Sequence, residues 1–397
     1  MSKGLLDGIR VLDLTRVLAG PYCCMILADM GAEVIKIERP GAGDDSRRNA
    51  PFVNGESAYF MNLNRNKSGI TLNLKTEEGK EVFRDLVRQS DVVVENYRPG
   101  VMDKLGLGYD ELRKINPGII YASVSGFGHY GPYSRRGGYD IIGQAMSGLM
   151  STTGWPGGEP TRTGTAIADV MSGISCCTGI LGALVNKART GEGEKIDVAL
   201  VDSMVSAMEI INMIYLCEGR IPQRIGNRYE ALSPYDSFRT GKGSMVIGAG
   251  NDKLFGILCG LMGKPELTED ERFRTNSLRV INAAELKPYI EDWLSGMTAE
   301  EAVDKLLAAG CPAGQIYDVS QVVTDPHIAG AREMFVEVDH PVAGHMKLTG
   351  TQFKFTNHKI DEFRPAPLLG ADTGSVLSGL LGYSEEKIKE LREKGAL

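Results

Sequence analysis

The sequence predicts an α/β protein with a mostly parallel sheet and a second, smaller α/β domain. Two observations lead to this prediction. Short apolar strands alternate with helices through residues 9–126, a pattern typical of parallel sheets with right-handed crossovers. The chain also has 397 residues, more than one compact core usually contains. We therefore expect a Rossmann-like large domain and a small domain.

The elements of the large domain follow from hydrophobic periodicity. One helix is amphipathic and begins after Thr76, a residue type that caps helix N-termini. The segment rich in small residues at 20–31 also predicts a helix, as does 102–115. The predicted strands are rich in Val and Ile and lie at 9–15, 32–39, 70–75, 91–96, 119–126 and the start of 195–216, which continues into a helix.

Residues 127–168 contain 10 glycines and 3 prolines, which predicts long loops. In open α/β folds such loops lie over the carboxyl edge of the sheet, where ligands bind. We therefore expect the functional residues to gather at this edge.

A second group of elements follows a weakly periodic segment. Residues 238–250 predict a hairpin and 252–263 a helix. A helix at 298–310 begins with the capping box Thr298-x-x-Glu301. A further hairpin is predicted at 334–350, then a proline-rich arm and a helix at 384–395.

The composition of the chain disfavours several classes of protein. The net charge is −7 with a pI near 5.5, which disfavours a nucleic-acid partner. Seven cysteines without a Cys-x-x-Cys pattern indicate neither a disulfide framework nor a zinc site. The N-terminus has no signal-peptide pattern, and the longest uncharged run is too short and too rich in Gly, Ser and Thr to span a bilayer. We expect a cytoplasmic enzyme without a membrane association.

Several familiar motifs are incomplete. Glycine clusters at 41, 104 and 248 are fragments of a dinucleotide fingerprint, and none has its full spacing and strand-to-helix context. The five histidines are scattered without metal-ligand spacing, so we expect no metal. No Gly-x-Ser-x-Gly elbow occurs, which disfavours serine-hydrolase chemistry.

Cationic residues are dense near the start of this acidic chain. They have two interpretations, which the sequence leaves open: solvated surface charge, or a docking site for a phosphorylated ligand. The residues are Lys36, Arg39, Arg47, Arg48, Arg65 and Lys67.

Asp169 directly precedes sixteen uncharged residues, 170–185. Its simplest interpretation is a helix N-cap. The helix dipole would keep such a carboxylate ionised at neutral pH, and the small neighbours would let a substrate reach it. A carboxylate is a weak nucleophile, but its attack on a thioester carbonyl would give a mixed anhydride.

Several longer segments together resemble one family over essentially the whole chain. They are GIRVLDLTRVLAGPY at 8–22, GAEVIKIERPGAGDDSR at 31–47, NRNKSGITLNLKTEEG at 64–79, VENYRPGVMDKLGLGY at 94–109, ADVMSG around Asp169 and RPAPLLGADT at 364–373. The chain is identified by them as a member of the class III CoA-transferases of the CaiB/BaiF type, which include formyl-CoA and carnitine CoA-transferases.

The resemblance implies an interlocked homodimer with acyl-CoA and a carboxylic acid as substrates and no permanently bound cofactor. It implies a large CoA-binding domain at 1–204, a linker at 205–232, a small domain at 233–325, a return linker at 326–350, and a final part of the large domain at 351–397. Asp169 matches the family's acyl-carrying nucleophile. The implied CoA site consists of Arg16, Val17, Leu18, Arg39, Leu74, Lys75, Asn96, Tyr97, Lys104 and Tyr139.

Three departures narrow the activity. Leu18 stands where formyl-CoA transferase has a glutamine, and GAGNDK at 248–253 replaces that enzyme's longer glycine-rich loop. Tyr139 stands where the related α-methylacyl-CoA racemases carry a histidine base, and a tyrosine with a pKa of about 10 is a poor replacement. A racemase-like enzyme and a formyl-CoA:oxalate CoA-transferase are therefore the alternatives to the preferred transferase.

The acceptor acid is suggested by three segments, at 231–243, 246–255 and 272–286. They resemble the branch that uses succinyl-CoA and dicarboxylic acids such as glutarate. A second carboxylate needs a cationic partner, and Arg47, Arg48 or Arg135 could supply it. Backbone N–H groups of the GAGN segment could stabilise the oxyanions of the reaction.

Overall fold

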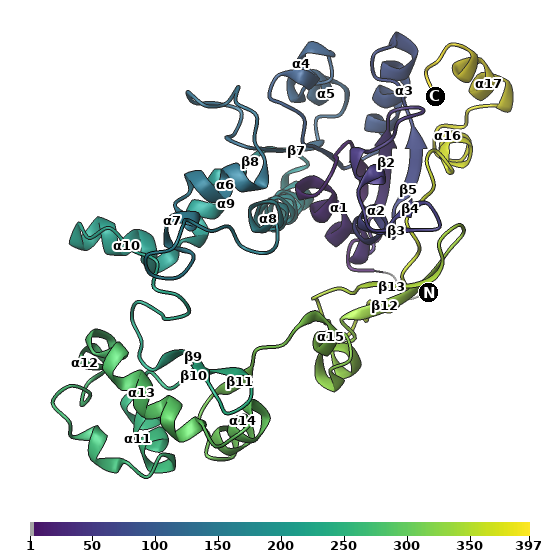
Figure 1. The fold of residues 1–397 in the computed structure, drawn as a ribbon. Coiled ribbons are helices and arrows are strands. Elements are labelled where there is room, and N and C mark those ends of the chain that lie inside the picture. Colours follow the sequence, from purple (N-terminus) through teal and green to yellow (C-terminus); the bar gives the residue numbers. More distant parts are fainter. Residues whose placement is uncertain (1–3) are drawn as a thin grey trace. The chain divides into compact units, whose positions relative to one another are not determined.

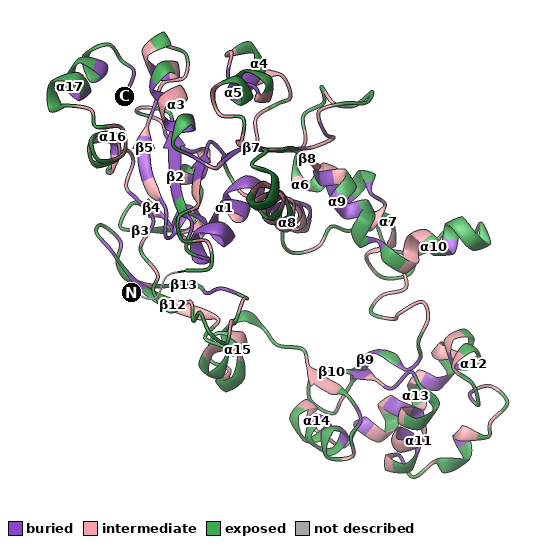
Figure 2. Cartoon of the chain, turned by 180° about the vertical axis from the view of Figure 1, so that it is seen from behind, coloured by how far each residue is buried: buried purple, intermediate pink, exposed green. Residues whose placement is uncertain are grey.

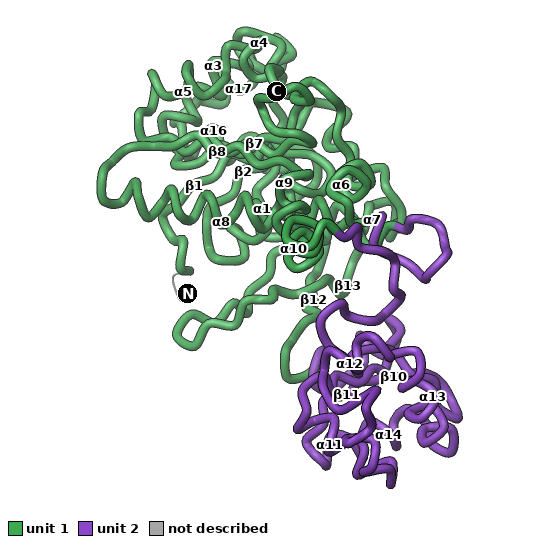
Figure 3. The backbone as a smooth tube through the Cα atoms, turned by 90° about the vertical axis from the view of Figure 1, so that its left-hand side faces the viewer, with its two compact units in different colours: residues 1–149, 162–219, 329–397 green, residues 150–161, 220–328 purple. Residues whose placement is uncertain are grey.

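The computed structural model describes residues 4–397, which form two compact units. The larger unit contains the residues up to 149 together with 162–219 and 329–397, and the smaller unit contains 150–161 and 220–328 (Figure 3). The chain therefore leaves the larger unit after residue 219 and returns to it at 329.

A six-stranded sheet forms the centre of the larger unit (Figure 1). All its neighbouring strands pair in parallel, in the order β5-β2-β1-β6-β7-β8. This is the strand order of doubly wound nucleotide-binding folds, and the predicted α/β class is confirmed. The strands are β1 Arg10–Asp13, β2 Glu33–Glu38, β5 Ser68–Thr71, β6 Val92–Glu95, β7 Ile120–Ser125 and β8 Lys195–Ala199.

Helices cover both faces of this sheet. Successive strand residues point to opposite faces, and apolar residues on each face pack against helices. Val92 and Val94 pack with helices α1 (Ala19–Asp29) and α8 (Ile167–Thr190) in one core. Val93 packs in the other core, which contains residues of five other helices. These are α3 Glu77–Arg88, α4 Val101–Lys104, α5 Tyr109–Ile115, α16 Thr373–Leu381 and α17 Glu385–Glu393. Strand β2 and helix α1 are largely buried (Figure 2), whereas β8 at the edge of the sheet is only partly buried.

Helix α8 is longer than its uncharged segment suggested. It has 24 residues, and an 18-residue window with a mean hydropathy of 1.6 is apolar enough to cross a membrane. Buried residues recur along it at helical spacing, among them Ala168, Ser172, Cys176 and Ile180, and they face α1 and the sheet. The expectation that this segment is too short was wrong. Its buried stripe packs in the core of the larger unit, and 33% of the apolar window is buried.

Local sequence signals had mixed outcomes. The Thr76 cap is confirmed, since its side chain accepts the N–H of Gly79 at 3.1 Å. The helix predicted at 102–115 is two helices, α4 (Val101–Lys104) and α5, because Gly106 adopts a left-handed φ of 71° between them. The glycine-rich stretch at 127–168 also contains two helices that were not predicted, α6 (Asp140–Met146) and α7 (Leu149–Thr152).

The remaining elements of the larger unit are short or lie near its boundaries. The hairpin predicted at 334–350 is confirmed as β12 and β13, whereas the predicted linker at 205–232 begins in helix. The short and boundary elements of the larger unit are η1 Asp45–Arg48, β3 Phe52–Val53, β4 Glu56–Ser57, α2 Ala58–Asn64, α9 Leu200–Ala207, α10 Glu209–Glu218, η3 Pro326–Ala331 across the unit boundary, β12 Phe335–His340 and β13 Gly344–Thr349.

The smaller unit has an antiparallel sheet in the order β11-β10-β9, with its own apolar core. The predicted capping box is confirmed, with Thr298 and Glu301 bonding reciprocally. Its elements are β9 Tyr235–Arg239, β10 Ser244–Gly248, α11 Asp252–Leu261, η2 Pro265–Thr268, α12 Asn276–Ile281, α13 Ala283–Leu294, α14 Ala299–Ala308, β11 Ala313–Gln315 and α15 Val319–Val322.

Candidate functional site

The site lies where the strand order of the large sheet reverses direction. Strands β1 and β6 are neighbours there, and the connections that follow them lead to opposite sides of the sheet. Such a switch point leaves a crevice beyond the carboxyl ends of the strands. Arg16 follows β1, and Asn96 and Tyr97 follow β6.

Two cavities open at this edge and share Arg16 and Tyr97. The first, which we call the β1–β5 cavity, lies beyond the ends of β1, β2 and β5. Its wall is largely apolar and includes Ile37, Leu72 and Leu74. The second, which we call the Asp169 cavity, lies between the N-termini of α1 and α8 and the loops after β6 and β7.

The structure brings most of the predicted CoA residues to these two cavities. Nine of the ten line them: Arg16, Arg39, Leu74, Lys75 and Tyr97 in the β1–β5 cavity, and Arg16, Val17, Leu18, Asn96, Tyr97 and Tyr139 in the Asp169 cavity. Lys104 lines neither, although Val101 and Leu105 on either side of it line the first. The predicted nucleophile and the predicted CoA residues therefore share one edge of the sheet.

Polar contacts hold the turn at Arg16 and Val17 between the cavities. The side chain of Asn96 accepts the N–H of Arg16 and donates to its carbonyl, both at 2.8 Å. Val17 has a φ of 67°, which is unusual for a β-branched residue and indicates a constrained turn. Its N–H donates to Oδ1 of Asp44 at 3.1 Å. This turn thus depends on side chains from two other connections.

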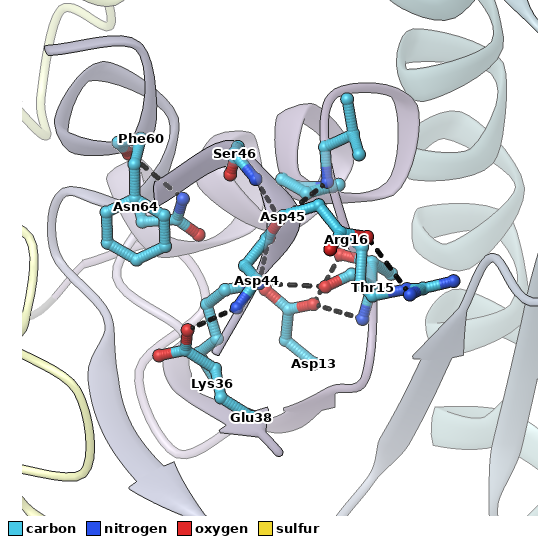
Figure 4. A network of polar contacts seen from close by, with 12 residues as sticks. Asp13, Thr15, Arg16, Lys36, Glu38, Asp44, Asp45, Ser46, Phe60 and Asn64 are labelled. Atoms are coloured by element: carbon cyan, nitrogen blue, oxygen red, sulfur yellow. Dashed lines mark hydrogen bonds and ion pairs between the residues drawn. The ribbon is translucent and has the colours of Figure 1, made fainter. Parts of the chain in front are cut away.

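Beneath the turn lies a buried ionic network (Figure 4). Lys36 is completely buried, with its Nζ 3.0 Å from Oδ2 of Asp44 and 2.8 Å from the carbonyl oxygen of Thr15. Lys67 donates to Asp13 at 2.8 Å. Burial would raise the pKa of Asp13, but the two lysines outweigh it and lower that pKa to about 2. A buried charge without a partner would destabilise the fold, and here each buried lysine is paired with a buried aspartate.

This network answers the question about the cationic residues near the N-terminus. Lys36, Lys67 and Arg65 are buried in ion pairs, so for them both interpretations were wrong. Arg47 makes a bidentate contact with Glu38 at 2.7 and 2.6 Å. Of the six residues, only the exposed Arg39 lines either cavity.

Tyr139 reaches the Asp169 cavity because the loop after β7 folds back on the strand end. A Cβ atom added to Gly138 would lie 2.2 Å from the Cα of Gly126, so only glycine allows the two backbones to approach this closely. The same loop places Arg136 and Gly137 on the cavity wall.

Asp169 is in the first turn of α8 but is not its N-cap, which is Ala166. Asp140 from α6 instead binds a free N–H group at the N-terminus of α8, since its Oδ1 accepts the N–H of Ala168 at 2.8 Å. Burial raises the pKa of Asp169 to about 7, and the negative charge of Asp140 adds to this increase. The expectations of an N-cap and of a fully ionised carboxylate at neutral pH were both wrong.

Sequence reasoning missed four residues of this site. Asp140 and Asp44 act through contacts with residues 28 and 27 positions away, which no local pattern reveals. Arg98 and Arg136 line the Asp169 cavity. Arg98 directly follows the predicted CoA residues Asn96 and Tyr97, and this position in the sequence could have indicated that Arg98 belongs to the site.

Comparison with known proteins adds independent findings. The family model described as CoA-transferase family III matches residues 6–373. A succinyl-CoA:glutarate CoA-transferase from Mus musculus is 42% identical over 99% of this chain and 90% of its own length. An acetyl-CoA:oxalate CoA-transferase from Acetobacter aceti is 44% identical over 97% of this chain and 98% of its own length.

A solved structure has the same fold. A crystal structure of a CAIB/BAIF family protein from Brucella suis superposes with a TM-score of 0.83 at 40% identity. The alignment covers 96% of this chain and all of that one. The likeness therefore extends across both compact units.

The buried network makes a prediction about stability. Lys36→Met leaves the Asp44 carboxylate buried without its cation, so the free energy of unfolding should fall by about 3–5 kcal/mol. Lys114→Met is the matched control, because Lys114 forms an exposed pair with Glu111 that is worth about 1 kcal/mol or less. Urea unfolding followed by circular dichroism measures both, and equal losses in the two variants would contradict the importance of the network.

Proposed function

The chain belongs to CoA-transferase family III and is an enzyme that transfers CoA, and we propose that it moves CoA between dicarboxylic acids with Asp169 as the nucleophile. One observation carries this proposal. Asp169 lies in a cavity with Arg16, Asn96 and Tyr97, at the switch point where this sheet order places ligands.

The first half-reaction has two steps. The ionised carboxylate of Asp169 attacks the thioester carbonyl of the donor, the C–S bond breaks, and CoA leaves as a thiolate with an aspartyl anhydride left behind. The thiolate then attacks the aspartyl carbonyl, which gives an enzyme–CoA thioester and releases the donor acid. The acceptor carboxylate repeats these steps in reverse and restores Asp169. Because one thioester replaces another, the reaction needs no ATP.

Residues around Asp169 support these steps. Leu18 and Leu200 line the cavity and limit the access of water to an anhydride. The N-terminus of α1 contributes Ala19 to the same wall, and the N–H groups of a first helical turn favour negative charge. Residues 248–251 belong to the smaller unit, and their role in binding the oxyanions stays a prediction.

The β1–β5 cavity suits the nucleotide end of CoA. Its apolar wall can cover the adenine ring, and Arg39 and Lys75 are cations suited to phosphate groups. Arg16 and Tyr97 line both cavities. An acyl-CoA molecule could therefore extend from one cavity into the other and place its thioester at Asp169.

Dicarboxylic acids are the proposed acid substrates, with succinyl-CoA and glutarate as the first pair to test. The segments at 231–243, 246–255 and 272–286 support this choice. The acids named for the two curated relatives, glutarate and oxalate, each carry two carboxyl groups. The similarity to the oxalate enzyme keeps a shorter dicarboxylate as the alternative acceptor.

We also propose the interlocked homodimer. Its first support is the chain path, which leaves the larger unit after residue 219 and returns at 329. Its second support is apolar surface: on α10 only Ile214 is buried, whereas Leu216 is 73% and Tyr215 57% exposed. Large exposed apolar side chains on one helix suit burial against a second copy.

The role of Asp169 can be tested by mutation. Asp169→Ala removes the carboxyl group proposed to carry the acyl group and then CoA, so kcat should fall at least about 10³-fold while CoA affinity is retained. Asp202→Ala, which removes an exposed carboxylate from the first turn of α9, should leave kcat unchanged. Calorimetry with CoA and a chromatographic transfer assay measure both properties. Near-normal transfer by Asp169→Ala would refute the assignment.

The raised pKa of Asp169 predicts a pH dependence. Below about pH 7 the carboxyl is increasingly protonated and cannot attack, so kcat/KM should fall about tenfold per pH unit. Asp140→Asn keeps an acceptor for the N–H of Ala168 but removes the neighbouring charge, so the midpoint should move to lower pH. Profiles of kcat/KM for the acyl-CoA provide the measurement. A midpoint that is the same in both proteins would contradict the role of Asp140.

The interlocked dimer predicts slow subunit exchange, because linked chains separate only when one of them unfolds. Analytical ultracentrifugation at nanomolar concentration should still show a dimer. Mixing of tagged and untagged protein should give no mixed dimers under native conditions and should give them after unfolding and refolding. Rapid mixing without denaturant would exclude the interlocked arrangement.

A further inference from the structure

Two arginines lie together on the wall of the Asp169 cavity. Arg98 belongs to the loop after β6 and Arg136 to the loop after β7, and both line the cavity with Asp169. Nη2 of Arg98 lies near the second loop, since a Cβ atom added to Gly137, the residue after Arg136, would be 3.5 Å from it. Two arginines from separate loops therefore contribute to one wall of the cavity.

Neither guanidinium is neutralised within the described chain. Among residues 4–397, Arg98 makes no side-chain hydrogen bond or ion pair, and Arg136 only stacks on the ring of Tyr133, at 3.6 Å. The third arginine of the cavity differs, since Arg16 pairs with Asp45 at 3.2 Å and stacks on Tyr97. Two arginines without an ion-pair partner among the described residues thus line the cavity that contains Asp169.

A dicarboxylate creates an electrostatic problem in this cavity. Its second carboxylate brings a negative charge close to Asp169, which must itself be ionised to react. Like charges in a partly desolvated cavity repel each other strongly. Guanidinium groups offset this repulsion and also orient a planar carboxylate through paired hydrogen bonds.

We propose that Arg98 and Arg136 form the subsite for the second carboxylate of the acid, and this inference rests on the proposed function. The subsite replaces the candidates suggested by the sequence. Arg47 is held by Glu38, Arg48 pairs with Asp45, and Arg135 does not line the Asp169 cavity.

The same guanidinium chemistry would also suit the phosphate groups of CoA. The two ligands make different predictions. A carboxylate subsite affects only acyl groups and acids that carry a second carboxylate, whereas a phosphate subsite affects every CoA thioester equally. The β1–β5 cavity already offers Arg39 and Lys75 for phosphates, so the carboxylate is the ligand to which we assign Arg98 and Arg136.

The test compares two substrate pairs in the full-length enzyme. One pair is succinyl-CoA with glutarate, and the other is butyryl-CoA with valerate, which have similar chain lengths but no second carboxylate. Arg98→Gln and Arg136→Gln should each lower kcat/KM for the dicarboxylate pair about tenfold, mostly through KM, because both groups are exposed and partly screened. The monocarboxylate pair should change little. Arg113→Gln, which alters an exposed arginine of α5 outside both cavities, should change neither pair.

Each other outcome has a distinct meaning. Equal losses with both pairs, together with weaker binding of free CoA, would overturn the subsite in favour of phosphate contacts. A wild-type enzyme that prefers dicarboxylates and variants that keep this preference would overturn the subsite alone. A wild-type enzyme without a preference for dicarboxylates would overturn both the subsite and the proposed substrate class.

Discussion

The two completely buried lysines, Lys36 and Lys67, determine where the chain turns at the carboxyl end of β1. With Asp13 and Asp44 they form ion pairs beneath the turn at Val17. Such pairs add little net stability compared with an apolar core, but breaking one is costly, so they specify one arrangement. Here that arrangement is a left-handed turn, whose N–H bond to Asp44 keeps Arg16 and Val17 on the cavity walls.

Two aspartates near this edge show how their surroundings decide their chemistry. Burial acts on both, but two lysines lower the pKa of Asp13 to about 2, whereas burial and Asp140 raise the pKa of Asp169 to about 7. The first carboxylate is therefore permanently ionised and structural. The second can change its protonation near neutral pH, as expected of a group at a functional site. Helix α8, which carries Asp169, is linked to α6 by the hydrogen bond from the N–H of Ala168 to Asp140.

Much of the fold could be predicted from the sequence because strands such as Val92–Glu95 are buried on both faces and read as continuous apolar runs. The prediction that Asp169 and the CoA residues share one site came from the family resemblance, and the structure brings Asp169 and nine of those ten residues to the two cavities. The error about the Asp169 cap arose because Asp140, which belongs to another helix, accepts an N–H of the first turn of α8. The burial of Lys36 and Lys67 was hidden for the same reason: each depends on a carboxylate from another part of the chain.

The central claim is that Asp169 forms a covalent intermediate, and a half-reaction without acceptor tests it most directly. Enzyme mixed with succinyl-CoA alone should release one equivalent of succinate and retain CoA on the peptide that contains Asp169, as measured by mass spectrometry. Hydroxylamine should then convert this residue to a hydroxamate, and Asp169→Ala should give neither product. Transfer at the normal rate in the presence of acceptor, without any succinate release or modified peptide in its absence, would contradict the account.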